Sequence, residues 1–231
     1  MLEKQFLKSD RLDLANTQIK LNDVIYKYNN FGFRCDDFDS WENYPIRILF
    51  AGCGITEGVG IPLDKSWANI FHSMLCKEVG KIPFWNIAYK GASLDHLVKH
   101  LYIEGEILQP HIVISLLPKF EYRERWNNDY WDSKINKNRE DYNSTRTFLK
   151  KNYIQYQTEK NLSFINLLMN RWNCKFLYIN QNEDFNMSNI VFPNFKRFDN
   201  HIKLINNIFE TNKIFAENLF KDMYPYLRKN K

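Results

Sequence analysis

One segment constrains the fold more than any other: a short apolar run that ends in a glycine-rich turn and leads into an amphipathic stretch. Residues 47–51, RILFA, are typical of a strand buried on both faces. Glycines punctuate the next residues, 52–60. Apolar side chains then recur at spacings of three and four from Trp67 to Leu75, which predicts a helix that ends near Gly80. A strand, a tight turn and a helix in this order predict the start of a βαβ unit.

The same rhythm repeats along the rest of the chain. Further strands are predicted at residues 84–88, 111–117 and 175–179, with a short edge strand at 190–192. Further helices are predicted over residues 94–101 with Ser93 as N-cap, over 148–172 as a helix broken in the middle, and over 205–220 as a closing helix. Alternating strands and helices predict an α/β fold, with a doubly wound parallel sheet flanked by helices in a three-layer sandwich.

Length and composition favour a single domain over residues 1–231, because 44% of the side chains are hydrophobic and 16% are aromatic. Within it we expect an ordered N-terminal extension, residues 1–45, and an inserted loop, residues 119–147, of the length typical of functional lids. No run of about 18 apolar residues occurs, and the N-terminus lacks the apolar stretch of a signal peptide. We therefore expect a soluble, cytoplasmic protein with no membrane partner.

Charge and cysteine usage exclude several function classes. The net charge of +5 arises from 32 basic and 27 acidic residues without a basic stripe, so no nucleic-acid partner is predicted. The four cysteines lack the paired spacing of a zinc site or a disulfide framework, and we expect free thiols. No metal-ligand or cofactor motif is present, so we predict neither a metal nor a cofactor. The oligomeric state stays open.

The turn itself carries a resemblance. Residues 52–58, GCGITEG, resemble the first conserved block of the SGNH (GDSL-type) hydrolases, G-D-S-x-T-x-G, in the variant with cysteine at the second position. The resemblance implies an active-site turn at the carboxyl edge of the sheet. Its third residue is the nucleophilic serine of the family, and here it is Gly54. Glycine has no atom that attacks a carbonyl, but its backbone N–H can still serve as an oxyanion donor. Thr56 and Glu57 are predicted to bind substrate.

A second stretch, residues 86–93 (NIAYKGAS), resembles the second block of the family, N-x-G-x-x-G-x-S. The resemblance implies that Gly91 supplies a second oxyanion donor, and Asn86 is predicted to bind substrate. A plainer interpretation of Gly91 stays open, in which it only lets strand and helix approach closely.

The later blocks depart from the family pattern. No asparagine follows the third strand, and Arg123 in this region either meets an anionic substrate group or is solvated. Asp199 and His201 stand just before the closing helix, but one residue separates them where the family has two. The resemblance implies His201 as base and Asp199 as its orienting carboxylate. An aspartate that caps the helix beside an unrelated histidine is the alternative.

Three functions remain open from the sequence. The first is an ester hydrolase lineage acting on an acylated glycan or small ester, in which Gly54, natural or introduced, leaves activity lost, weak or removed. The second is a non-catalytic module that binds a glycan or acyl group. The third is a structural or assembly protein. The lead-in at residues 28–34, YNNFGFR, resembles that of some bacterial and phage-encoded members.

Overall fold

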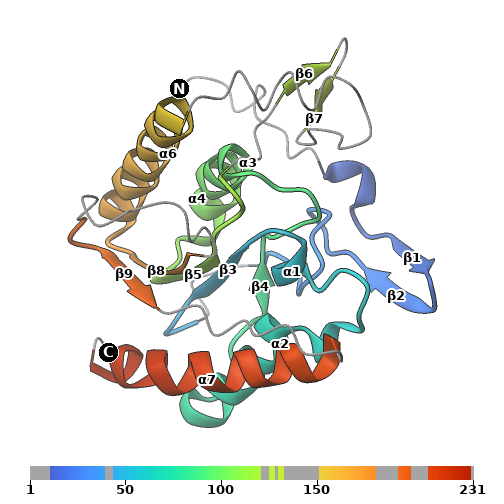
Figure 1. Cartoon of the computed structure of the whole chain (residues 1–231). Coiled ribbons are helices and arrows are strands. Elements are labelled where there is room, and N and C mark those ends of the chain that lie inside the picture. The colour runs from blue at the N-terminus through green and yellow to red at the C-terminus, as the bar shows by residue number, and fades with distance from the viewer. Residues whose placement is uncertain are drawn as a thin grey trace.

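A five-stranded parallel sheet forms the centre of the protein in the computed structural model (Figure 1). The structure describes residues 11–39, 44–120, 125–127, 130–132, 151–180, 192–198 and 208–229. The strands, in their order across the sheet, are β4 (Trp85–Asn86), β3 (Ile48–Gly52), β5 (Ile112–Leu116), β8 (Lys175–Ile179) and β9 (Phe195–Phe198). Every neighbouring pair is parallel. The predicted α/β fold with a parallel sheet is confirmed.

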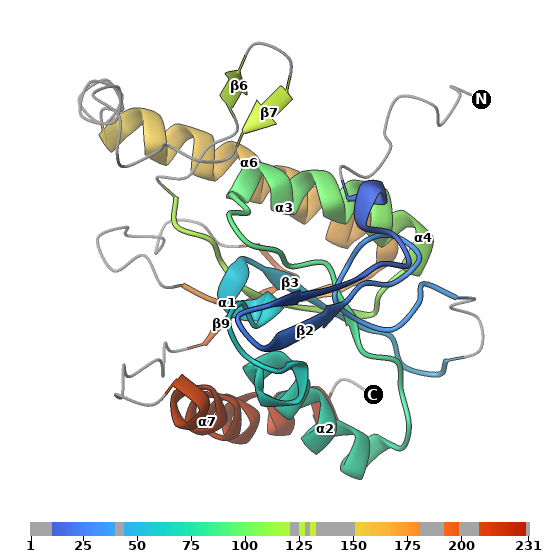
Figure 2. The same cartoon turned by 90° about the vertical axis from the view of Figure 1, so that its right-hand side faces the viewer.

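Helices cover both faces of the sheet and make three layers (Figure 2). One face carries α2 (Trp67–Val79) and α7 (Ile208–Lys229), and the other carries α3 (Leu94–His100) and α6 (Lys151–Trp172). Successive residues of β3 show why a continuous apolar run is needed here. Ile48 and Phe50 pack in the core that contains Trp67, whereas Leu49 packs in the core of the opposite face. Each β3 side chain therefore has a helix layer to bury it.

One predicted helix needs correction. The helix predicted to break between residues 148 and 172 is continuous as α6 from Lys151 to Trp172. The polar residues in the middle of α6 do not break the helix, because Asn161 Nδ2 donates a 2.6 Å hydrogen bond to Asp95 of α3. The last described strand is β9, Phe195–Phe198, whereas residues 190 and 191 of the predicted edge strand lie outside the described residues. β9 lies at the sheet edge, where its two charged side chains are exposed, so its sequence has no continuous apolar run.

The second helix is longer than predicted. After α3 the chain passes through a π-helical segment, η5 (Leu101–Gly105), and ends in α4 (Glu106–Leu108). The second strand, predicted over five residues, pairs with β3 only at Trp85–Asn86.

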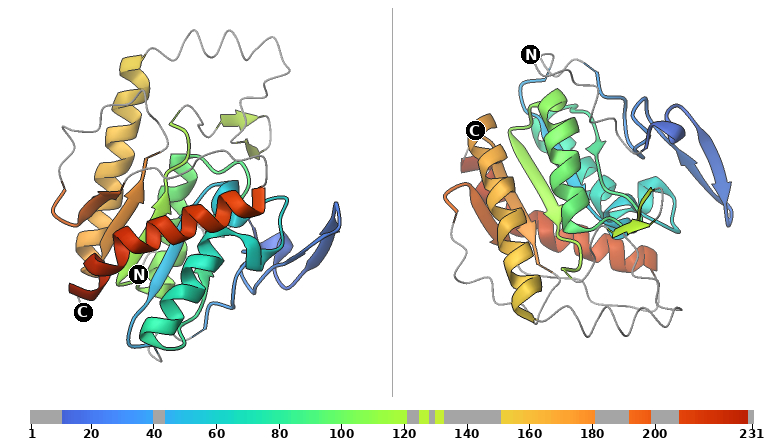
Figure 3. Two further views of the ribbon diagram at one scale, coloured as in Figure 1. Left: turned by 60° about the horizontal axis from the view of Figure 1, so that its bottom comes forward. Right: turned by 90° about the horizontal axis from the view of Figure 1, so that it is seen from above.

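The N-terminal segment stands beside the sheet rather than in it. It contains the 3-10 helix η2 (Leu12–Leu14) and an antiparallel hairpin of β1 (Gln18–Leu21) and β2 (Val24–Lys27), which projects from the body (Figure 3). Val24 and Tyr26 are buried while β1 is exposed throughout. Beyond the hairpin, the segment approaches the short helix α1 (Gly54–Glu57) that follows β3.

The predicted inserted loop contains a second antiparallel hairpin, β6 (Arg125–Asn127) with β7 (Tyr130–Asp132). Arg123, Asp199 and His201, three of the predicted site residues, lie outside the described residues. None of the described helices is long and apolar enough to cross a membrane. Within the described part of the chain, no three His, Cys, Asp or Glu side chains gather in a group that could hold a metal ion.

Candidate active-site turn

The predicted active-site turn lies at the carboxyl end of β3, the second strand of the sheet. β3 ends at Gly52, Cys53 occupies the N-cap position, and Gly54 begins the single turn of α1. Gly58 ends α1 in the left-handed conformation and donates its N–H to the carbonyl of Gly54 at 3.1 Å. Ligands of open α/β sheets bind at this edge.

Gly54 lies in close contact with the second motif block. A Cβ added to Gly54 would lie 3.1 Å from Val59 Cγ2 and 3.3 Å from Lys90 Cα. Both separations are shorter than ordinary van der Waals contact between carbon atoms. The structure thus brings the nucleophile position of the first block against the residue that precedes Gly91 in the second.

The backbone donors of the two blocks are available at this point. Among the described residues, no acceptor is hydrogen-bonded to the N–H of Gly54 or of Gly91, and both glycines are partly exposed. Gly91 has φ of 81°, a left-handed conformation that favours glycine. This conformation is compatible with both interpretations of Gly91, so its role as a donor stays a prediction.

Asn86 clamps the two blocks together. Its Nδ2 donates to the carbonyl of Thr56 at 3.0 Å, and its Oδ1 accepts the N–H of Ala88 at 3.0 Å. Asn86 and Thr56 are buried. The Asn86 side chain therefore serves the backbone of both turns, and the prediction that it binds substrate stays untested.

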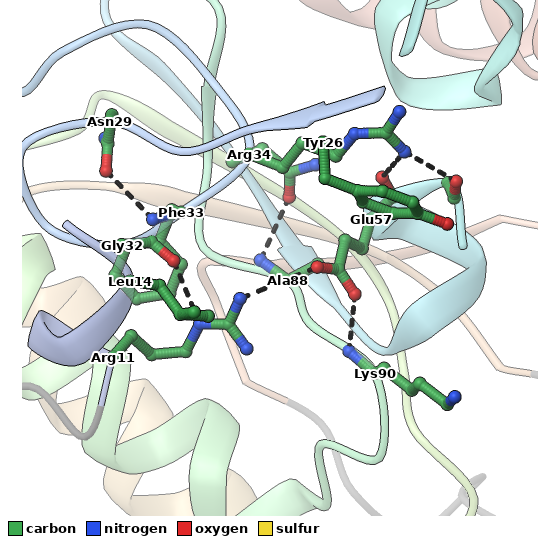
Figure 4. Close-up of polar contacts among 12 residues, drawn as sticks. Arg11, Leu14, Tyr26, Asn29, Gly32, Phe33, Arg34, Glu57, Ala88 and Lys90 are labelled. Carbon is green, nitrogen blue, oxygen red and sulfur yellow. Dashed lines mark hydrogen bonds and ion pairs between the residues drawn. The ribbon is translucent and has the colours of Figure 1, made fainter. Parts of the chain in front are cut away.

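Glu57 provides a second link between the blocks (Figure 4). Only 3% of this residue is exposed, and its Oε2 accepts the backbone N–H of Lys90 at 2.6 Å. Its Oε1 lies 3.6 Å from a guanidinium nitrogen of Arg11. Burial raises the pKa of Glu57, while Arg11, the Lys90 N–H and Arg34 act in the opposite direction. Its predicted role in substrate binding likewise stays a prediction.

Two arginines that the sequence interpretation missed hold this region. Arg34 is 1% exposed, and its guanidinium donates to the carbonyls of Gly58 at 2.7 Å and Ile61 at 3.0 Å. It also lies 4.1 Å from the centre of the Tyr26 ring. The signal was an arginine among the aromatic residues of the lead-in, a setting in which a buried guanidinium can stack. Arg11 stands in a stretch without periodicity, so no sequence signal marked it.

The helix after the second block starts as predicted. Ser93 is the N-cap of α3, and its Oγ accepts the N–H of His96 at 3.3 Å. The ring of His96 closes the capping box by accepting the N–H of Ser93. The start of α3, and with it the end of the Gly91 loop, is therefore fixed.

The carboxyl end of β5 lacks the asparagine of the family pattern. Leu117 and Phe120 are buried where the chain leaves β5. An asparagine does occur at the end of the neighbouring strand, since Asn180 follows β8 directly and is buried. A polar residue immediately after a predicted strand was the signal that could have singled it out.

A cavity of about 590 Å³ opens at the opposite end of the sheet. It is lined by residues that include His111, Ile112, Lys175 and Leu227. Because Ile112 and Lys175 begin their strands, this cavity is separate from the turn at Gly54, which follows the end of β3.

Solved structures provide the comparison that decides the fold. The psychrotrophic esterase EstA from Pseudoalteromonas sp., solved with monoethylphosphonate as inhibitor, matches with a TM-score of 0.51 over 78% of this chain and 98% of its own. The chain has the SGNH-hydrolase fold. At 11% identity this likeness shows the fold alone.

Two further solved structures match with TM-scores below 0.5. TesA matches with a TM-score of 0.40 and 14% identity. The match covers 57% of this chain and 58% of the length of TesA. A protein from Parabacteroides merdae described as a GDSL-like lipase matches with a TM-score of 0.37 and 15% identity, over 78% of this chain and 74% of its own. No protein-family model and no curated protein sequence matches the chain.

Proposed function

We propose that this chain comes from an ester hydrolase lineage and retains a carbonyl-binding turn for a small ester or acylated glycan, with catalysis lost or weak at Gly54. In this proposal the N–H groups of Gly54 and Gly91 bind the carbonyl oxygen, and His201 with Asp199 stands at the base position. Without a nucleophilic side chain at position 54, no acyl-enzyme forms there. Backbone donors alone can still polarise a bound carbonyl.

The observation that carries the proposal is the close approach of Gly54 to Lys90. A Cβ on Gly54 would lie 3.3 Å from Lys90 Cα, so Gly91 is close to Gly54 although the two glycines are far apart in sequence. The N–H groups of both glycines have no hydrogen-bonded acceptor among the described residues. Two such donors near the nucleophile position are the elements from which an oxyanion hole is built.

Crowding at the same position supports the second candidate, a module that binds an acyl group or glycan without any turnover. Val59 Cγ2 and Lys90 Cα occupy the surroundings in which a serine Cβ would have to fit. In this candidate, a serine at position 54 is not activated.

Labelling with a fluorophosphonate separates the two candidates. An activated serine attacks phosphorus, an Oγ–P bond forms and fluoride leaves, and the mass of the protein increases. We expect label on Gly54→Ser, none on the wild type or on Gly54→Ala, and loss of label in Gly54→Ser/His201→Ala. A folded Gly54→Ser variant without label would exclude a retained catalytic frame and leave the binding module.

A further inference from the structure

A residue of the N-terminal segment reaches the site turn. Arg11 immediately precedes η2, and its side chain is 12% exposed. Its Nε donates to the carbonyl of Gly32 at 3.0 Å (Figure 4). Its guanidinium lies 4.7 Å from the centre of the Tyr89 ring. Tyr89 belongs to the second motif block. Arg11 is thus held by the N-terminal segment while it stacks on the block that contains Gly91.

From this position Arg11 meets the carboxylate that binds the second block. A guanidinium nitrogen lies 3.6 Å from Glu57 Oε1, and the other oxygen, Oε2, accepts the N–H of Lys90. A carboxylate with one oxygen paired to a cation keeps its second oxygen in a fixed direction. The chain of contacts runs from Arg11 through Glu57 to the Tyr89–Lys90 peptide, one residue ahead of Gly91.

We propose that Arg11 is a positioning residue: it orients the Glu57 carboxylate, which fixes the Lys90–Gly91 backbone beside Gly54. The inference rests on the proposed function in one respect, namely that the Gly91 N–H is a carbonyl-binding donor. The N-terminal segment is then part of the site, although it contributes no atom that touches the ligand.

The chemistry of the contact requires arginine. The guanidinium lies over the Tyr89 ring, donates to Gly32 and pairs with Glu57 at the same time. A lysine ammonium keeps the charge but lacks the plane and the fixed fork of donors. Arg11→Lys should therefore retain part of the effect, whereas Arg11→Ala should lose it.

Amide hydrogen exchange of Lys90 tests the proposal without any ligand. We take the ratio of the Lys90 exchange rate to that of Val113, an amide of the central strand β5 that reports global opening. We expect this ratio to rise about fivefold in Arg11→Ala and about twofold in Arg11→Lys, as for a weak coupling between Arg11 and the Lys90 N–H contact. Arg47→Ala is the matched control, because Arg47 donates to the carbonyl of Gln109 near the opposite edge of the sheet. Its ratio should not change.

The double variant tells positioning from general support. If Arg11 acts through the Glu57 carboxylate, the double variant Arg11→Ala/Glu57→Gln should have the same exchange ratio as Glu57→Gln alone. An unchanged ratio in Arg11→Ala, or fully additive effects in the double variant, would overturn the proposal. In the Gly54→Ser background, Arg11→Ala should also slow fluorophosphonate labelling about fivefold. Absence of label in Gly54→Ser itself contradicts the proposed function, while the exchange result still decides the positioning role.

Discussion

Asn86 Nδ2 donates a hydrogen bond of 3.0 Å to the carbonyl of Thr56 and so joins two motif blocks that are 30 residues apart. The contact explains why both blocks need their polar residues even without a nucleophile. The same side chain accepts the N–H of Ala88, so one buried amide supports the backbone on both sides. The backbone at the Gly54 turn is thus held by hydrogen bonds that involve no serine.

Removing this amide should destabilise the protein. Asn86→Ala leaves the Thr56 carbonyl and the Ala88 N–H unpaired in a buried place, which costs about 2 kcal/mol. Urea unfolding measures the loss. The control is Asn194→Ala, because the amide of Asn194 bonds to Asn170 at an exposed site. That variant should change stability by less than about 0.5 kcal/mol, and equal losses in the two variants would contradict the clamp.

Loss of the Arg34 guanidinium should cost more. Arg34→Met retains an unbranched apolar side chain but removes the donors to the carbonyls of Gly58 and Ile61, and we expect a loss of about 3 kcal/mol in the free energy of unfolding. Arg171→Met is the matched control. Arg171 is 57% exposed and paired with Glu106, so its loss should cost less than about 1 kcal/mol. A small effect at Arg34 would show that the carbonyls find other donors.

The crowding around Gly54 predicts an interaction between Gly54 and Val59. Gly54→Ala places a Cβ 3.1 Å from Val59 Cγ2, and overpacking of this kind costs about 1 kcal/mol. In a Val59→Ala background the added methyl has room, so the same substitution should cost less. A double-mutant cycle by urea unfolding measures the difference. Strict additivity would mean that the turn relaxes at no cost.

Glu57 should make stability fall as pH rises. Burial raises its pKa in the folded state above the ordinary value of 4.5, so the folded protein holds this proton more tightly than the unfolded chain. The contribution is fully present below the unfolded pKa and is lost as pH rises through the higher folded pKa. Arg11, Arg34 and the Lys90 N–H surround the carboxylate and limit the shift, and Tyr28 also senses its charge.

Unfolding between about pH 4 and about pH 8 tests this sign. Glu57→Gln should show a flatter profile than the wild type over this range. Arg11→Ala should move the loss of stability to higher pH, because the substitution removes a cation that favours the ionised Glu57 carboxylate. A profile that is the same in wild type and Glu57→Gln would contradict the assignment.

The sheet and its helices followed from the sequence because their signals are local. Apolar runs such as residues 111–117 and the stripe from Trp67 to Leu75 specify burial directly. The position of the edge strand β9 could not be predicted in this way, because an edge strand needs few apolar residues. The π-helical segment η5 also had no local signal. Its Glu104 forms a buried 3.0 Å contact with His100, the last residue of α3.

The site was predictable only where a motif marked it. Gly54, Gly91 and Asn86 stand in the two blocks, and the structure brings these blocks together. Arg11 and Arg34 reach the turn from the N-terminal segment, and no spacing rule connects residues 11 and 34 with residue 57. Long-range contacts of this kind are set by the tertiary fold.

The most direct test of the account is the hydrolysis of p-nitrophenyl acetate by three proteins: wild type, Gly54→Ser and Gly54→Ala. The alanine variant adds the same Cβ without the hydroxyl, so it controls for crowding at the turn. If the turn retains its carbonyl-binding frame and lacks only the nucleophile, Gly54→Ser should be at least about tenfold faster than both others. A folded Gly54→Ser variant that is no faster than Gly54→Ala would contradict the account.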